Sequence, residues 1–136
     1  MRIVALSFFI SSFLLLSNEC EKGEAMIEKD PSFAIVNVYS QEHIPGQQNE
    51  LVRTEIGLEI SGLEENILLE NVYFNGHFSN QVIERNEIFK AFLRPEVEEG
   101  IIDIESNDAI LFYLEENKKY YFVLKDVQTK EPIYLP

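Results

Sequence analysis

The chain has 136 residues, enough for one domain of ordinary size, and its 24 acidic and 11 basic residues give a formal net charge of −13. Such an acidic surface repels phosphate backbones and anionic lipid headgroups, which argues against nucleic-acid binding and against electrostatic adsorption to membranes. With one cysteine and two histidines, the chain cannot form an intramolecular disulfide and offers few ligands for a metal.

The first 19 residues have the pattern of an export signal. Arg2 is followed by an uncharged apolar segment, residues 3–16, which suits a secretory signal but is shorter than the roughly 20 apolar residues of a membrane-spanning helix. The composition then turns polar abruptly. We therefore expect residues 1–19 to be removed, residues 20–31 to form a flexible acidic tether, and residues 32–136 to form the folded domain.

The sequence allows two positions for the cleavage site of the export signal. The segment resembles a bacterial lipoprotein signal, in which a lipidated cysteine, here Cys20, becomes the mature amino terminus. Leu16 stands four places before Cys20 rather than three, and Glu19 occupies a position where a small residue is expected. The alternative is cleavage after Ser17. Lipid on Cys20 would anchor the protein, since each buried methylene contributes about 0.8 kcal/mol. We expect an outer-membrane lipoprotein, and otherwise a periplasmic or secreted protein.

Two strands are predicted at the start of the domain. Residues 33–39 are rich in β-branched and aromatic side chains and follow a breaker at Asp30-Pro31. A polar loop separates them from the second strand, which begins near residue 52. There the alternation with a period of two predicts an inward face formed by three apolar residues, Ile56, Leu58 and Ile60.

Two further strands follow. Residues 67–78 predict a third strand with a bend at Asn75-Gly76, because both residues tolerate positive φ. Residues 87–93 predict a fourth strand. A helix over residues 81–92 is the alternative, and it ranks second because the apolar residues of this segment favour strands.

The carboxyl-terminal hairpin is the clearest local pattern. Residues 109–114 and 120–124 flank a polar turn in which Asn117 suits the left-handed position. Both faces of both strands are apolar, so we expect these strands to be covered on two sides or to be central in a sheet. With turn signals about every ten residues, the pattern predicts an all-β fold, a single antiparallel β-sandwich of immunoglobulin-like type.

An acidic loop, residues 96–108, is a weak candidate for a calcium site. Asp103, Glu105 and Asn107 have alternating spacing and oxygen ligands of the kind that Ca²⁺ prefers. The EF-hand pattern is not met, because Asp108 stands where the tight-turn glycine belongs. A solvated acidic loop is therefore the preferred interpretation.

Two tyrosines are the best candidates for binding. Tyr113 and Tyr121 share their predicted strand faces with charged residues, so we expect an exposed strip that binds a protein or a carbohydrate partner. Cross-strand aromatic packing is the alternative, and His77 is expected to be structural. With no nucleophile motif and no phosphate-binding loop, we expect no enzymatic activity and no cofactor.

Several short segments have a pattern known from other proteins. They are residues 72–76 (VYFNG), the hairpin of residues 109–124, residues 131–136 (EPIYLP) and residues 41–46 (QEHIPG), in which His43 departs from the usual aromatic residue. On these segments the chain resembles a family of small, uncharacterised envelope proteins of Bacteroidetes. The resemblance implies a lipoprotein-type signal, and because the family has no established activity it implies no catalytic or binding residue.

The sequence thus predicts a non-enzymatic, exported envelope protein that acts as a binding or accessory module. Two alternatives stay open. A small-ligand-binding β-barrel would need a closed sheet around an internal cavity. A carboxylate-based hydrolase would need a cleft that holds two carboxyl groups with perturbed pKa values.

Overall fold

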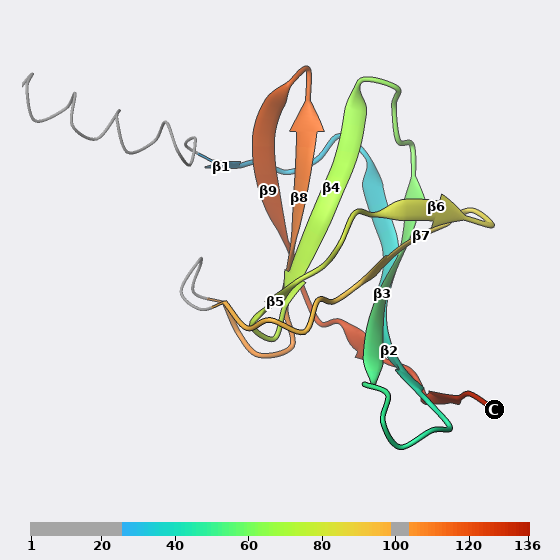
Figure 1. Cartoon of the computed structure of the whole chain (residues 1–136). Coiled ribbons are helices and arrows are strands. Elements are labelled where there is room, and N and C mark those ends of the chain that lie inside the picture. The colour runs from blue at the N-terminus through green and yellow to red at the C-terminus, as the bar shows by residue number, and fades with distance from the viewer. Residues whose placement is uncertain (1–25, 99–103) are drawn as a thin grey trace, which may run out of the picture.

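The structure is a computed structural model that describes residues 26–98 and 104–136 (Figure 1). The predicted export signal, Cys20 and Asp103 lie outside the described residues. Within them the chain is all-β, with strands in two mixed sheets. These residues include no helix that is long and apolar enough to cross a bilayer.

The strands of each sheet come from both halves of the chain. In order across sheet A, they are β1 (Ile27–Glu28), β9 (Lys118–Leu124), β8 (Ala109–Glu115), β4 (Ile67–Phe74) and β5 (His77–Phe78). In order across sheet B, they are β10 (Gln128–Thr129), β2 (Ala34–Ile44), β3 (Arg53–Ser61), β7 (Ile88–Phe92) and β6 (Ile83–Arg85), and β11 (Ile133–Tyr134) also pairs with β2.

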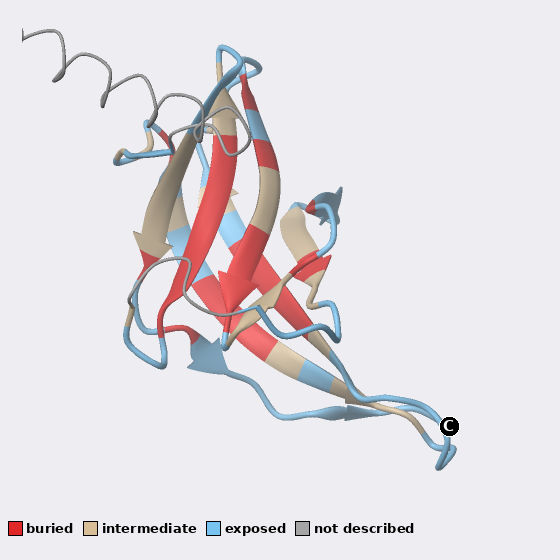
Figure 2. Ribbon diagram, turned by 60° about the vertical axis from the view of Figure 1, so that its left-hand side comes forward, coloured by how far each residue is buried: buried red, intermediate tan, exposed pale blue. Residues whose placement is uncertain are grey.

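The two sheets face each other across a shared apolar core, in a sandwich-like arrangement (Figure 2). Sheet B contributes Ile56 and Leu58, and sheet A contributes Val72 and Leu111, all 1% exposed or less. Ile60 packs against this core, so the predicted inward face of β3 is confirmed. Both sheets are open at their edges, and the closed sheet that a ligand-binding barrel needs is not found in the described residues.

Three hairpins in the described part of the chain have two-residue turns, and the first of them, β4–β5, turns at Asn75 and Gly76, with φ values of 53° and 85°, where the bend was predicted. In the β8–β9 turn, Glu116 and Asn117 have φ values of 53° and 66°, as a type I′ turn requires, so the predicted hairpin is confirmed. The β6–β7 turn has the same form at Asn86 and Glu87, with φ values of 55° and 67°. This second hairpin occupies residues 83–92, so the alternative of a helix there is wrong.

The prediction that the carboxyl-terminal strands are central is confirmed for β8, which lies between β9 and β4. Its residues pack on both faces of sheet A. Leu111 belongs to the core between the sheets, whereas Ile110 and Phe112 belong to a second apolar cluster on the outer face. This second cluster explains why both faces of the strand are apolar in sequence.

Two features of the predicted architecture need correction. The sheets are mixed rather than purely antiparallel, because β1 runs parallel to β9, and β10 and β11 run parallel to β2. In addition, β1 lies inside the range assigned to the tether. The Lys29 backbone N–H donates to the Tyr121 carbonyl at 3.0 Å, and Lys29 Nζ pairs with Glu115 at 2.8 Å. The domain therefore begins at about residue 27.

Candidate functional site

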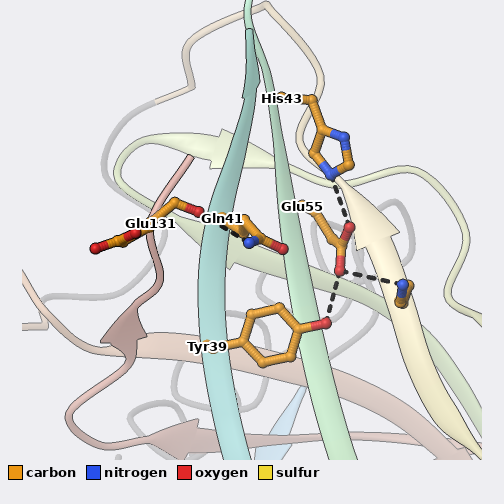
Figure 3. A network of polar contacts seen from close by, with 6 residues as sticks. Tyr39, Gln41, His43, Glu55 and Glu131 are labelled. Carbon is orange, nitrogen blue, oxygen red and sulfur yellow. Dashed lines mark hydrogen bonds and ion pairs between the residues drawn. The ribbon is translucent and has the colours of Figure 1, made fainter. Parts of the chain in front are cut away.

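The outer face of sheet B carries a buried charged residue, Glu55, which is 2% exposed (Figure 3). The register of β2 and β3 sets this face. Its cross-strand pairs are Tyr39 with Gly57, Gln41 with Glu55, and His43 with Arg53. On the other side of β3, Phe92 of β7 lies opposite Glu55. Three strands thus surround the carboxylate.

The carboxylate of Glu55 is held by three side chains. The Tyr39 hydroxyl donates to Oε2 at 2.7 Å, His43 Nε2 lies 2.8 Å from Oε1, and Lys90 Nζ lies 3.5 Å from Oε2. Because an ionised carboxylate only accepts hydrogen bonds, His43 must carry its hydrogen on Nε2. Burial acts to raise the pKa of the Glu55 carboxyl, but the hydrogen bonds from Tyr39 and His43 and the charge of Lys90 outweigh burial, and the pKa is lowered. The network therefore holds Glu55 ionised.

The position of Tyr39 depends on a glycine in the neighbouring strand. The Tyr39 ring lies over Gly57, where any Cβ would overlap its atoms. On the ring, Lys130 Nζ lies 3.9 Å from the centroid. Burial, and then the hydrogen bond to Glu55, raises the pKa of Tyr39, so its hydroxyl stays protonated as a donor. The only sequence signal for this site was a glycine inside a strand, which often marks a close approach.

A hollow of about 260 Å³ opens beside Glu55. It lies between β2, the β6–β7 hairpin and the segment before β6. Its lining residues are His43, Glu55, Asn80, Gln81, Ile83, Arg85, Lys90 and Phe92. Among the described residues, Glu55 is the only carboxyl group that lines it. The pair of carboxyl groups needed for the hydrolase alternative is not brought together in this hollow.

The outer face of sheet A carries a row of aromatic rings. Tyr73 and Phe78 have ring centroids 4.9 Å apart, Phe78 and Phe112 5.8 Å, and Phe112 and Tyr121 6.4 Å. The row therefore crosses the sheet from β5 to β9. Tyr73 and Phe112 are buried, whereas Phe78 and Tyr121 are half-buried.

A larger hollow, of about 570 Å³, lies beside this row. Phe78 and Phe112 give it an apolar surface, and amide and charged side chains from several segments give it a polar rim. Its lining residues are Met26, Glu70, Asn71, Phe78, Ser79, Asn80, Gln81, Arg94, Phe112, Lys119 and Tyr120. This volume lies within the range of roughly 300 to 1,000 Å³ that is usual for small-ligand sites.

The predicted tyrosine strip is not formed. Tyr113 is 0% exposed and lies in the core between the sheets, where its ring packs edge-on against Phe33 at 5.5 Å. Tyr121 pairs with Phe112 on the opposite face of sheet A. The charged neighbour that suggested exposure, Glu115, lies at the end of β8, where the strand leaves the core. Cross-strand aromatic packing describes both tyrosines.

The calcium candidates are only partly described. Glu105 and Asn107 are exposed. Among the described residues of this loop, Asp108 is buried, and it accepts hydrogen bonds from the Asp126 backbone N–H and Lys125 Nζ, both at 3.0 Å. These two bonds, the first above all, lower the pKa of Asp108. Asp108 thus fixes the turn after β9, and no group of three or more potential metal ligands gathers within the described part of the chain.

His77 is held by the backbone. Its Nδ1 lies 2.8 Å from the Arg94 carbonyl and 3.0 Å from the Glu96 carbonyl. Since both partners accept, Nδ1 carries a hydrogen and joins β5 to the segment that follows β7. This contact fits the structural role expected for His77.

The chain matches no family model, no curated protein and no solved structure. The resemblance to Bacteroidetes envelope proteins therefore stays a prediction.

Proposed function

We propose that the protein is a non-enzymatic binding module that binds a carbohydrate in the hollow on the outer face of sheet A. The observation that carries this proposal is the composition of the hollow. Phe78 and Phe112 offer apolar surface to the face of a sugar ring, while Asn71, Asn80 and Gln81 offer amide donors and acceptors to its hydroxyl groups. A sugar needs both kinds of contact.

The charged residues of this hollow favour binding over catalysis. Glu70 is the only carboxyl group among the described residues that line it. Glycoside hydrolysis generally uses two carboxyl groups about 5 to 10 Å apart across the scissile bond. A single carboxyl group, in a hollow that Arg94 and Lys119 also line, suits hydrogen bonding to a ligand instead.

Replacing Asn71 by alanine is expected to weaken glycan binding by about tenfold, because the amide contributes hydrogen bonds that alanine cannot make. Asn71 lies on β4 beside Phe112, so its amide is next to the aromatic surface. The measurement is binding of the purified mature protein to a glycan panel, followed by calorimetric titration of the best glycan. Asn37→Ala is the matched control, since Asn37 is exposed on β2, outside this hollow.

The contrary outcome is also defined. The control Asn37→Ala should bind as tightly as the unchanged protein. If the panel retains no glycan, while crosslinking in the native envelope captures one protein partner, the carbohydrate proposal is wrong and a protein-binding role takes its place.

We infer that the sandwich is of immunoglobulin type. The support is its strand order. The sequence β2-β3-β7-β6 follows the order A-B-E-D, and β5-β4-β8-β9 follows the order C′-C-F-G. With one cysteine in the chain, the disulfide that joins strands B and F in antibody domains cannot form, and apolar packing of Ile56 and Leu58 against Leu111 takes its place.

We also propose that the protein is exported and anchored in the outer membrane by lipid on Cys20. The support is the sequence of residues 1–20. Because β1 begins at Ile27, the link from an anchored Cys20 to the sheet would be at most about 25 Å long when fully extended. The domain would therefore stay close to the membrane surface.

Mass spectrometry of the mature amino terminus tests this anchor. The expected result is a chain that begins at Cys20 and carries acyl groups, and Cys20→Ala should move the protein from the membrane fraction to the soluble fraction. An unmodified chain that begins at Asn18 would rule the anchor out and leave a periplasmic or secreted protein.

A further inference from the structure

Basic residues gather on the outer face of sheet B. Four of the 11 lysines and arginines of this acidic chain lie there, which are Arg53, Arg85, Lys90 and Lys130. Lys90 pairs with both Gly57 and Ile83, and Arg85 has the same strand parity as Ile83, so both lie on this face. Arg53 pairs with His43, and Lys130 lies over the Tyr39 ring, which puts them on the same face. Two of them, Arg85 and Lys90, line the hollow beside Glu55.

The hollow is rich in hydrogen-bond donors. Asn80 Oδ1 accepts from the Phe92 backbone N–H at 3.0 Å, so the Asn80 side chain keeps its NH₂ group for another partner. Lys90 has three hydrogens and approaches Glu55 with one nitrogen–oxygen contact. Arg85 is exposed and makes no ion pair with any other described residue. The guanidinium of Arg85 can therefore donate to a ligand in a planar fork.

Glu55 does not occupy the free hydrogen-bond donors of the hollow. Its side chain is 3% exposed, and both of its oxygens already accept from Tyr39 or His43. The formal charges that line the hollow are two positive, from Arg85 and Lys90, against this one buried negative charge. The hollow is thus locally positive on a chain whose net charge is −13.

We infer that this hollow binds a small oxyanion, a carboxylate or a phosphate group. Arg85, Lys90 and the Asn80 amide would donate to its oxygens, and Phe92 and Ile83 would contact a short apolar stem. At about 260 Å³ the hollow admits only a small molecule or one terminal group of a larger one. Asn80 and Gln81 line both this hollow and the proposed carbohydrate site, so the two sites adjoin at the segment before β6.

Titration of the ¹⁵N-labelled mature protein tests the inference. Sodium acetate and inorganic phosphate are added separately at constant ionic strength, so the two arms distinguish a planar carboxylate from a tetrahedral phosphate. We expect saturable amide shifts in residues 80–92 with at least one of the two anions. Arg85→Gln should weaken that binding by about tenfold or more, because a charge-assisted hydrogen bond is lost.

Two variants serve as controls. Lys118→Gln removes one positive charge from the exposed start of β9, away from the hollow, and should bind the anion as the unchanged protein does. Asn71→Ala, which tests the carbohydrate site, should also leave anion binding unchanged. Thermal melting should confirm that Arg85→Gln folds normally. Shifts that do not saturate, or an equal loss of binding in Arg85→Gln and Lys118→Gln, would overturn the inference.

Discussion

Replacing Glu55 by alanine is expected to lower the free energy of unfolding by about 3 kcal/mol, a large effect for a residue on the outer face of a sheet. The substitution removes the acceptor of the buried Tyr39 hydroxyl, the partner of His43 Nε2 and the counter-charge of Lys90. The Tyr39 hydroxyl cannot turn to another partner easily, because its ring is held against Gly57. Equilibrium unfolding in urea measures the effect.

Glu59→Ala is the matched control for this prediction. Glu59 lies on the same strand and the same face, but it is exposed, so its replacement should change the free energy of unfolding by less than about 0.5 kcal/mol. Equal losses for the two variants would show that the network around Glu55 contributes nothing beyond the charge of the strand.

The Glu55 network also gives the protein a defined response to acid. Since folding lowers the pKa of this carboxyl, the ionised form stabilises the fold at a pH above the unfolded-state pKa of about 4.3. That contribution is lost as the pH falls through the lower pKa of the folded state. In Glu55→Gln the side chain at position 55 does not titrate, so this acid-dependent loss of stability is absent. The free energy of unfolding of the variant should therefore fall less steeply below about pH 4.5.

The long strands could be predicted from the sequence because apolar and polar residues alternate along them or because a recognisable turn residue joins them. Residues of β3 alternate between apolar and polar or glycine, and the β8–β9 hairpin has a turn residue at the left-handed position. The short edge strands β1, β10 and β11 have two residues each, too few for any period to appear. They form because the edges of β9 and β2 offer unpaired backbone groups to whichever segment passes close by.

The candidate site was harder to predict, because it depends on which faces of the sheets are covered. In the sequence Glu55 has the pattern of an ordinary outward residue of β3, and only the tertiary structure brings Tyr39, His43 and Lys90 around it. The tyrosine strip failed for a related reason. A charged residue two places away in a strand indicates that a side chain is exposed only if both residues are equally far from the end of the strand. Tyr113 lies in the buried part of β8, whereas Glu115 is the last residue of that strand.

Replacing Tyr113 by alanine is therefore expected to reduce the free energy of unfolding by about 4 kcal/mol, as large-to-small changes in a core do. The ring is 0% exposed and packs against Phe33 and Tyr120, with centroids 5.5 and 5.7 Å away. Its hydroxyl donates to the Lys29 carbonyl at 2.9 Å, which helps to hold β1 against the sheet. Urea or thermal unfolding, followed by circular dichroism, gives the measurement.

Two further variants separate packing from hydrogen bonding and from binding. Tyr113→Phe keeps the ring and loses only the bond to Lys29, so it should cost about 1 kcal/mol. Tyr121→Ala, on the half-buried outer face, should cost clearly less than Tyr113→Ala, because less of its ring leaves a packed environment. If Tyr113→Ala were instead as stable as the unchanged protein and lost glycan binding, Tyr113 would have to face solvent, as the exposed strip required. The core between the two sheets would then lie on the other face of β8.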